Sequence, residues 1–220
     1  MFKSSVEIFR KDFKSELRTR YAFNSLLMFV IVTIAIIKFS LGDEKTDNEI
    51  LSGLFWIVVF FSASSGLSRV FIKEEEKETS VALKLSTSHP EVLAGKLIFN
   101  FALSFLINVV IFVFFIGATG IVIKNYSGFA ITFFLGNLGL VSVSTIIAAI
   151  ISKANSKGTL YPVLAFPVLL PLLLSLIEAG KLSAGGVETD RLLSEFLFLF
   201  SYTVVVTITS FILFKFIWED

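Results

Sequence analysis

The sequence contains no cysteine, and its only histidine is His89. Without thiols the chain can form no disulfide, bind no metal through thiolates and handle no cofactor through a reactive sulfur. A lone histidine beside Pro90, in a polar stretch, is far more often structural than a metal ligand. The residue types therefore argue against a metal site built from histidine or cysteine side chains.

Motifs for hydrolysis and nucleotide binding are also missing. The chain has no Walker A sequence, no Gly-x-Ser-x-Gly, no His-Glu-x-x-His and no glycine-rich phosphate loop. No acidic residue lies near the middle of its long apolar segments, which argues against a proton or cation pump built on buried carboxylates. A net charge of +1 gives no global basic field for nucleic acid. We therefore expect no catalytic residue, no tightly bound cofactor, no metal and no nucleic-acid partner.

Large apolar residues are abundant and are gathered into long runs. Hydrophobic residues make up 55% of the 220, the mean hydropathy is +0.86, and phenylalanine occurs 26 times. A membrane-spanning helix needs about 20 mostly apolar residues. The runs do not alternate with a period of two, so helices are favoured over a barrel. We predict an all-α membrane protein whose residues 21–218 form six transmembrane helices, the first retained rather than cleaved as a signal peptide. The predicted spans are 21–41, 50–72, 97–123, 129–151, 159–177 and 194–218.

Lysine and arginine are distributed unevenly between the two sides of these spans. Fourteen lie on the side of the termini: Lys3, Arg10, Lys11, Lys14, Arg18, Arg20, Arg69, Lys73, Lys77, Lys84, Lys96, Lys153, Lys157 and Lys215. Four lie on the other side: Lys45, Lys124, Lys181 and Arg191. Because basic loops are retained in the cytoplasm, we predict that both termini are cytoplasmic.

Residues 1–20 form an amphipathic, basic segment in front of the first span. Apolar residues recur in it at three- and four-residue intervals: Phe2, Val6, Phe9, Phe13 and Leu17. This spacing predicts a helix that lies in the cytoplasmic interface of the membrane. The alternative is a simple basic anchor that fixes the topology.

Residues 73–96 form the longest hydrophilic connection, and its first part is an acidic run. Thr79 or Ser80 can cap a short helix there, and Pro90 prevents that helix from simply continuing into the next span. An apolar face on a cytoplasmic helix favours docking to a cytosolic partner, whereas the alternative is a loop that folds back onto the membrane surface. The candidate docking residues are Glu78, Thr79, Val81, Ala82, Leu83 and Leu85.

The span 159–177 contains three prolines, Pro162, Pro167 and Pro171. Each removes a backbone donor, so this helix is predicted to be bent or broken. The freed carbonyls need a neighbour or a water-lined cavity. The span is then either a moving or pathway element, as in many transporters, or a static kink.

The span 129–151 carries Asn137 among glycines and hydroxyl residues. Together with Asn100 and Asn108, it is among the most polar groups expected within the membrane. Small and hydroxyl residues favour close helix packing, and a polar lining for a substrate path is the sharper alternative.

Several segments follow the basic amphipathic start in an order that resembles one known family. They are Leu51–Ile57, Leu67–Phe71, Glu91–Lys96, Gly136–Leu140, Ser152–Gly158 and Leu164–Pro171. Over nearly the whole chain this ordered set resembles the CcmB family, the B-type permease subunit of the cytochrome c maturation heme exporter. Glu78 in front of Thr79, and the stretch 86–90, depart from that family's usual pattern.

The resemblance implies a permease subunit of an ABC-type complex in the bacterial cytoplasmic (inner) membrane. A separate cytosolic ATPase would bind residues 73–96, and ATP hydrolysis would drive release of a heme-loaded periplasmic chaperone. A heme-handling membrane subunit and a small single-span subunit would complete the complex. A second copy of this chain is expected, since six spans suit half of a transporter. Heme would be a transported or complex-bound ligand of this complex.

Two alternatives to the permease function stay open. The chain could be a non-transporting scaffold of the same complex, or the permease of an ABC exporter for a lipid or drug.

Overall fold

All regular secondary structure in the described part of the chain is helical, as predicted. The computed structural model describes residues 2–42, 46–67, 71, 83, 87–153 and 160–219. Its elements are α1 (Phe2–Thr19), α2 (Tyr21–Leu41), α3 (Asn48–Leu67), α6 (His89–Thr119), α7 (Tyr126–Ser152), α8 (Leu160–Gly185), the short 3-10 helix η1 (Thr189–Leu192) and α9 (Leu193–Glu219). Six of these helices are long and apolar enough to cross a membrane, which confirms the predicted number of spans.

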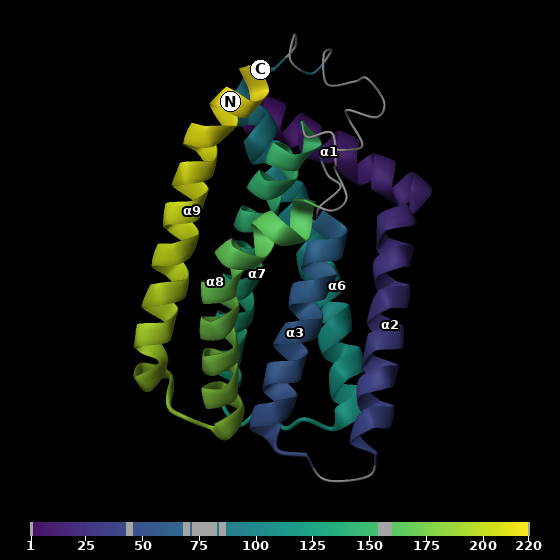
Figure 1. The fold of residues 1–220 in the computed structure, drawn as a ribbon, viewed down its shortest axis with the longest axis vertical. Coiled ribbons are helices and arrows are strands. Elements are labelled where there is room, and N and C mark those ends of the chain that lie inside the picture. The colour runs from purple at the N-terminus through teal and green to yellow at the C-terminus, as the bar shows by residue number, and fades with distance from the viewer. Residues whose placement is uncertain are drawn as a thin grey trace.

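The six long helices form a bundle with both chain ends at the same end of the molecule (Figure 1). That placement is what an even number of crossings requires. The helix α1 lies across this end of the bundle and leads directly into α2. We refer to this end as the terminal end and to the other as the opposite end.

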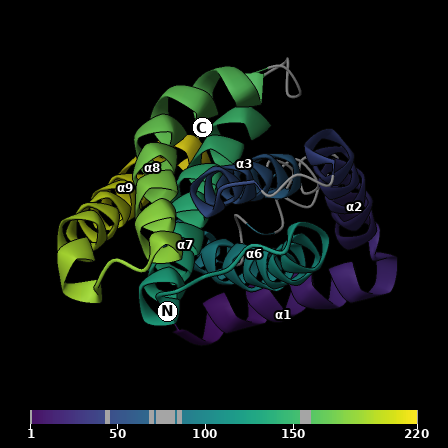
Figure 2. The ribbon, with the colours of Figure 1, turned by 90° about the horizontal axis from the view of Figure 1, so that it is seen from below.

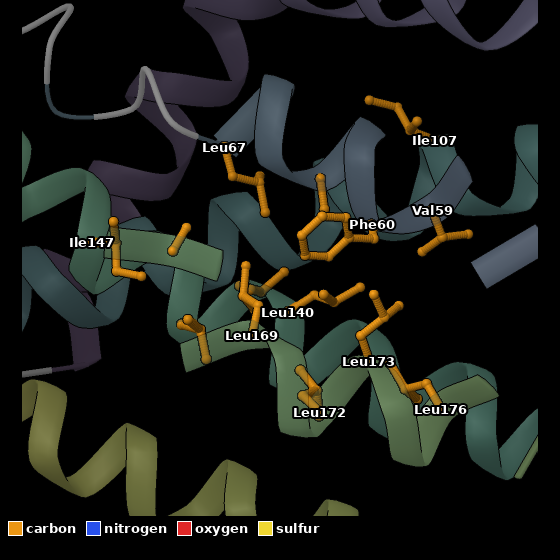
Figure 3. Packing of buried hydrophobic residues seen from close by; sticks show 14 of the residues in the cluster. Val59, Phe60, Leu67, Ile107, Leu140, Ile147, Leu169, Leu172, Leu173 and Leu176 are labelled. Carbon is orange, nitrogen blue, oxygen red and sulfur yellow. The ribbon is translucent and has the colours of Figure 1, made fainter. Parts of the chain in front are cut away.

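The core is built mainly by α3, α7 and α8, which pack closely on one another. The close view shows side chains of these helices pointing toward one another, with Phe60, Leu140 and Leu173 among them (Figure 3). Two glycines of α7 allow the close approach. A Cβ atom at Gly136 would lie 2.6 Å from the Leu176 side chain, and one at Gly139 would lie 2.8 Å from that of Leu172. Small residues thus act here as helix-packing contacts.

The outer helices α2 and α9 bury little of their surface within the chain. Only 17% of the apolar window of α2 and 11% of that of α9 is buried. Most of their exposed side chains are large and apolar, such as Phe39 and Phe216. Lipid or another membrane subunit must therefore cover these two helices.

The helix α6 begins and ends earlier than the predicted span 97–123. It begins at His89, because Ser88 forms a capping box with Glu91 and Pro90 occupies the first turn, where a missing N–H costs nothing. It ends at Thr119, because Gly120 takes the left-handed conformation (φ 67°) that closes a helix. The last residues of the predicted connection 73–96 thus belong to a 31-residue helix, about 46 Å long at 1.5 Å per residue.

The ends of the other spanning helices lie closer to the predicted ones, except the carboxyl end of α8. The helix α8 runs to Gly185, beyond the predicted end at residue 177, so Glu178 lies inside it and not at its end. Its inner face continues in buried Ala179 and Ala184 while Glu178 stays exposed, which is why hydropathy alone gave too short a span. The helix α3 is described to Leu67, and residues 68–70 and 72 of the predicted span lie outside the described residues.

Candidate functional site

The predicted docking region is described only at Leu83 and from residue 87 onward. Glu78, Thr79, Val81, Ala82 and Leu85 lie outside the described residues.

Leu83 itself is half-buried and packs against the hydrophobic core, and its carbonyl accepts the Thr87 N–H at 3.1 Å. At this residue, at least, the apolar side chain contacts the chain's own core.

A buried lysine lies where this region joins α6. Lys96 was counted among the loop cations, yet its side chain is only 2% exposed and its Nζ lies 2.8 Å from Oδ2 of Asp12 in α1. The same ammonium lies 5.7 Å from the centre of the Phe71 ring, a cation–π distance. Phe71 in turn contacts Phe214 of α9. Lys96, at the end of the 71–96 segment, therefore contacts both α1 and Phe71 at the start of that segment.

The helix α1 is fitted closely to α6 beside this ion pair. A Cβ atom at Gly95 would lie 2.8 Å from Cβ of Ile8 and 2.9 Å from the carbonyl oxygen of Ser5. At its other end, the buried Glu16 accepts the Phe23 N–H of α2 at 3.1 Å through Oε1. The position and rotation of α1 are thus set by contacts within the protein.

Asn137 lies at the centre of a buried hydrogen-bond cluster between α6 and α7. Its Oδ1 accepts from the Ser104 hydroxyl at 2.7 Å and from the Asn108 amide at 2.9 Å. One layer away, the Asn100 amide donates to the Thr145 hydroxyl at 2.7 Å. Such contacts are typical of polar groups that hold membrane helices together.

A small cavity adjoins this cluster. It is lined by Ser104 and Asn108 from α6, by Ser62 and Gly66 from α3, and by Leu26 from α2. Two members of the Asn137 cluster, Ser104 and Asn108, therefore line the cavity. Both also donate hydrogen bonds to Asn137 within the cluster.

The prolines of α8 bend the helix without breaking it. The helix is continuous from Leu160 to Gly185, with Pro167 and Pro171 inside it and exposed, and its ribbon bends in the amino-terminal part (Figure 1). Pro162 lies in the first turn, where N–H groups have no partner in any helix. In the bent part, the Tyr202 hydroxyl of α9 donates to the Val168 carbonyl. This bond ties α9 to the bent part of α8, at a carbonyl next to the one that Pro171 leaves without an N–H partner.

The opposite end of the bundle is held by hydrogen bonds between loops. Asn125 caps α7 by accepting the Gly128 N–H at 2.9 Å, and its amide donates to the Val187 carbonyl at 2.6 Å. The Val122 N–H donates to Oδ1 of Asn48 in α3 at 3.1 Å. These bonds join the α6–α7 and α8–η1 connections, and they tie α3 to the first of them.

The described side chains offer no obvious chemistry of their own. Among them, no group of three or more His, Asp or Glu residues is placed to hold a metal ion. A scan against protein-family models matches residues 3–216 to the CcmB protein family. The chain belongs to the CcmB family. A search of curated proteins gave no match.

Membership of the CcmB family decides the general function. CcmB proteins are membrane components of the heme exporter for cytochrome c maturation, and this chain is accordingly a multi-pass membrane subunit of a complex with other subunits. The CcmB family is one of permease subunits and not of known enzymes.

Sequence reasoning missed the pair of Asp12 and Lys96. A signal was present, because Asp12 shares a helical face with the buried Ser5, Ile8 and Glu16 and not with the basic residues of α1. Only the fold shows that Lys96, at 2.8 Å, is closer to Asp12 than its neighbour in the chain, Lys11, at 3.6 Å.

Proposed function

We propose that this chain is the permease through which ATP hydrolysis in a separate cytosolic subunit drives release of a heme-loaded periplasmic chaperone. The family match over residues 3–216 carries the proposal. The chain's own residues support it, because they contain no motif for ATP hydrolysis, no cysteine and, apart from His89, no histidine that could bind heme iron. The energy must then come from a partner, and heme would be a transported or complex-bound ligand.

Residues 73–96 are the proposed docking region for the ATPase, and the part before α6, residues 73–88, contains the candidate contacts. In the sequence this segment joins α3 to α6, and Lys96 of α6 contacts α1. Glu78, Thr79, Val81, Ala82, Leu83 and Leu85 remain the candidate contacts.

Leu85→Asp tests the docking proposal better than a change at Leu83, because Leu83 packs on the chain's own core. A charge on an apolar docking face should sharply reduce the amount of ATPase that co-purifies in detergent. Val122→Asp is the matched control, since Val122 is exposed at the opposite end of the bundle. If Leu85→Asp retains as much ATPase as Val122→Asp, the docking proposal is wrong.

We further propose that the terminal end is cytoplasmic and that the membrane is the bacterial inner membrane. The basic residues at this end support that orientation. The absence of native cysteine allows single-cysteine labelling. In intact spheroplasts a membrane-impermeant maleimide should label Lys124→Cys but not Lys14→Cys, and the reverse pattern would invert the topology.

The proposed complex contains a second copy of this chain, a heme-handling membrane subunit and a small single-span subunit. Six spans per chain support the second copy, and the scarcely buried α2 and α9 leave room for neighbours. Family membership argues against an exporter for lipids or drugs. A non-transporting scaffold of the same complex is the remaining alternative. Experiments with an ATPase that cannot hydrolyse ATP must distinguish it from the permease.

A further inference from the structure

The outward surface of α1 divides into two stripes of different chemistry. One is apolar and contains Phe13 and Leu17, which are 44% and 58% exposed. The other is basic and contains Arg10, Lys14 and Arg18, all exposed and spaced four residues apart, so that they lie on one side of the helix. The third side of α1 is the one that contacts α6.

Contacts with α6 fix the rotation of α1 about its own axis. The pair of Asp12 and Lys96, and the contact of Ile8 with Gly95, hold the inner side against α6. On a helical wheel, the apolar stripe then lies about a third of a turn from the inner side, and the basic stripe lies about a quarter turn further. The two stripes are therefore presented in a set direction.

The place of α1 in the bundle leaves these stripes uncovered by the other described helices. Seen along the bundle, α1 runs at the rim beside α6 and does not cover the centre (Figure 2). Its carboxyl end passes into the spanning helix α2 through Arg20, whose left-handed backbone makes the turn. The helix that follows α1 directly in the chain, α2, also has a largely apolar exposed surface.

We propose that α1 is a preformed binding site for anionic phospholipid headgroups. Phe13 and Leu17 would enter the boundary between headgroups and acyl chains, and the guanidinium and ammonium groups of Arg10, Lys14 and Arg18 would contact lipid phosphates. Glu7 is the one exposed acidic residue among the described side chains of α1, so the outward surface keeps a clear excess of positive charge. Because the helix is already ordered by α6, binding does not incur the cost of folding it.

The test uses the full-length chain in vesicles, with a fluorophore on Leu17→Cys as its single thiol. Vesicles contain phosphatidylcholine and phosphatidylglycerol, with bromine on one lipid or the other to quench nearby fluorescence. A basic residue beside an anionic surface favours the anionic lipid about 5-fold. We expect brominated phosphatidylglycerol to be preferred at this position by about that factor, with the preference falling at high salt.

The matched variants separate a specific site from general charge. Arg10→Gln, Lys14→Gln and Arg18→Gln together should bring the preference close to one, while leaving the contacts of Asp12 and Ile8 intact. Neutralising three exposed cations outside α1, Lys38, Lys124 and Arg191, should leave the preference unchanged.

Three results would overturn the proposal. The first is equal quenching by both lipids when Arg10, Lys14 and Arg18 are unchanged. The second is a preference for phosphatidylglycerol that survives the triple change in α1. The third is no quenching by either lipid. The last result would place α1 outside the membrane interface.

Discussion

The ammonium of Lys96 and the carboxylate of Asp12 form the most consequential contact between single residues in this chain. Removing one partner of a buried ion pair typically costs about 3–5 kcal/mol. The lower end of this range applies here, because Lys11 also lies 3.6 Å from Asp12. We expect Asp12→Asn or Lys96→Gln to lower the free energy of unfolding by about 3 kcal/mol, read as a lower Tm in detergent. The double change Asp12→Leu with Lys96→Met should recover part of the loss. Single variants as stable as the parent would show that the pair contributes nothing.

Two glycines of α6 give a matched test of the contact with α1. Alanine is favoured over glycine inside a helix by about 1 kcal/mol. A Cβ atom at Gly117 has nothing within 4 Å, so Gly117→Ala should be neutral or stabilising. Gly95→Ala should destabilise instead, because its Cβ would lie 2.8 Å from that of Ile8. Thermal unfolding of the two variants checks this, and equal effects would contradict the close fit of α1.

Asn137 can be tested as a packing residue against the alternative of a pathway residue. Asn137→Ala removes the oxygen that accepts from Ser104 and Asn108, and leaves the Asn108 amide only the Ser104 hydroxyl at 3.4 Å. Bonds of this kind contribute about 0.6 kcal/mol each in a membrane. Adding Ser104→Ala and Asn108→Leu removes the orphaned donors and should restore much of the Tm. We expect holocytochrome yield to follow the Tm across this series. A yield that stays low in the stable triple variant would instead assign the cluster to the substrate path.

At the scale of helices, the prolines of α8 are the feature with a predicted role in motion. Pro167→Ala with Pro171→Ala restores two backbone donors and should straighten the helix. We expect the holocytochrome yield to fall while the amount of assembled complex, measured by co-purification, stays the same. Pro162→Ala is the control, because its first-turn position has no intrahelical bond to restore. A normal yield in the double variant would argue for a static kink.

The six spans and the helix 2–19 could be predicted from the sequence, because each depends on the local pattern of apolar residues. The ends of two spans could not. The end of α6 depends on the left-handed backbone at Gly120, and the continuation of α8 past residue 177 depends on which face meets the core.

Contacts between distant segments were also beyond the sequence. Lys96 looked like an ordinary loop cation until the fold placed Asp12 beside it. By contrast, the polarity of Asn137 did point to a buried role, since an unpaired amide is costly in a membrane.

For the whole molecule, the arrangement favours force entering at one end. The terminal end joins α1, the segment 71–96 and α9 through Lys96, Phe71 and Phe214. The opposite end is joined by the hydrogen bonds of Asn125 and Asn48. Under the proposed coupling, a movement of the ATPase would be transmitted through these contacts of Lys96 and Phe71 to several helices together.

The most direct test of the proposed function is made on the assembled complex with an ATPase subunit that binds ATP but cannot hydrolyse it. The measurement is release of heme-loaded chaperone from membranes that contain this chain unaltered. Coupling through this permease predicts that release stops while the complex stays assembled. Full release without hydrolysis would contradict it and would leave this chain as a scaffold.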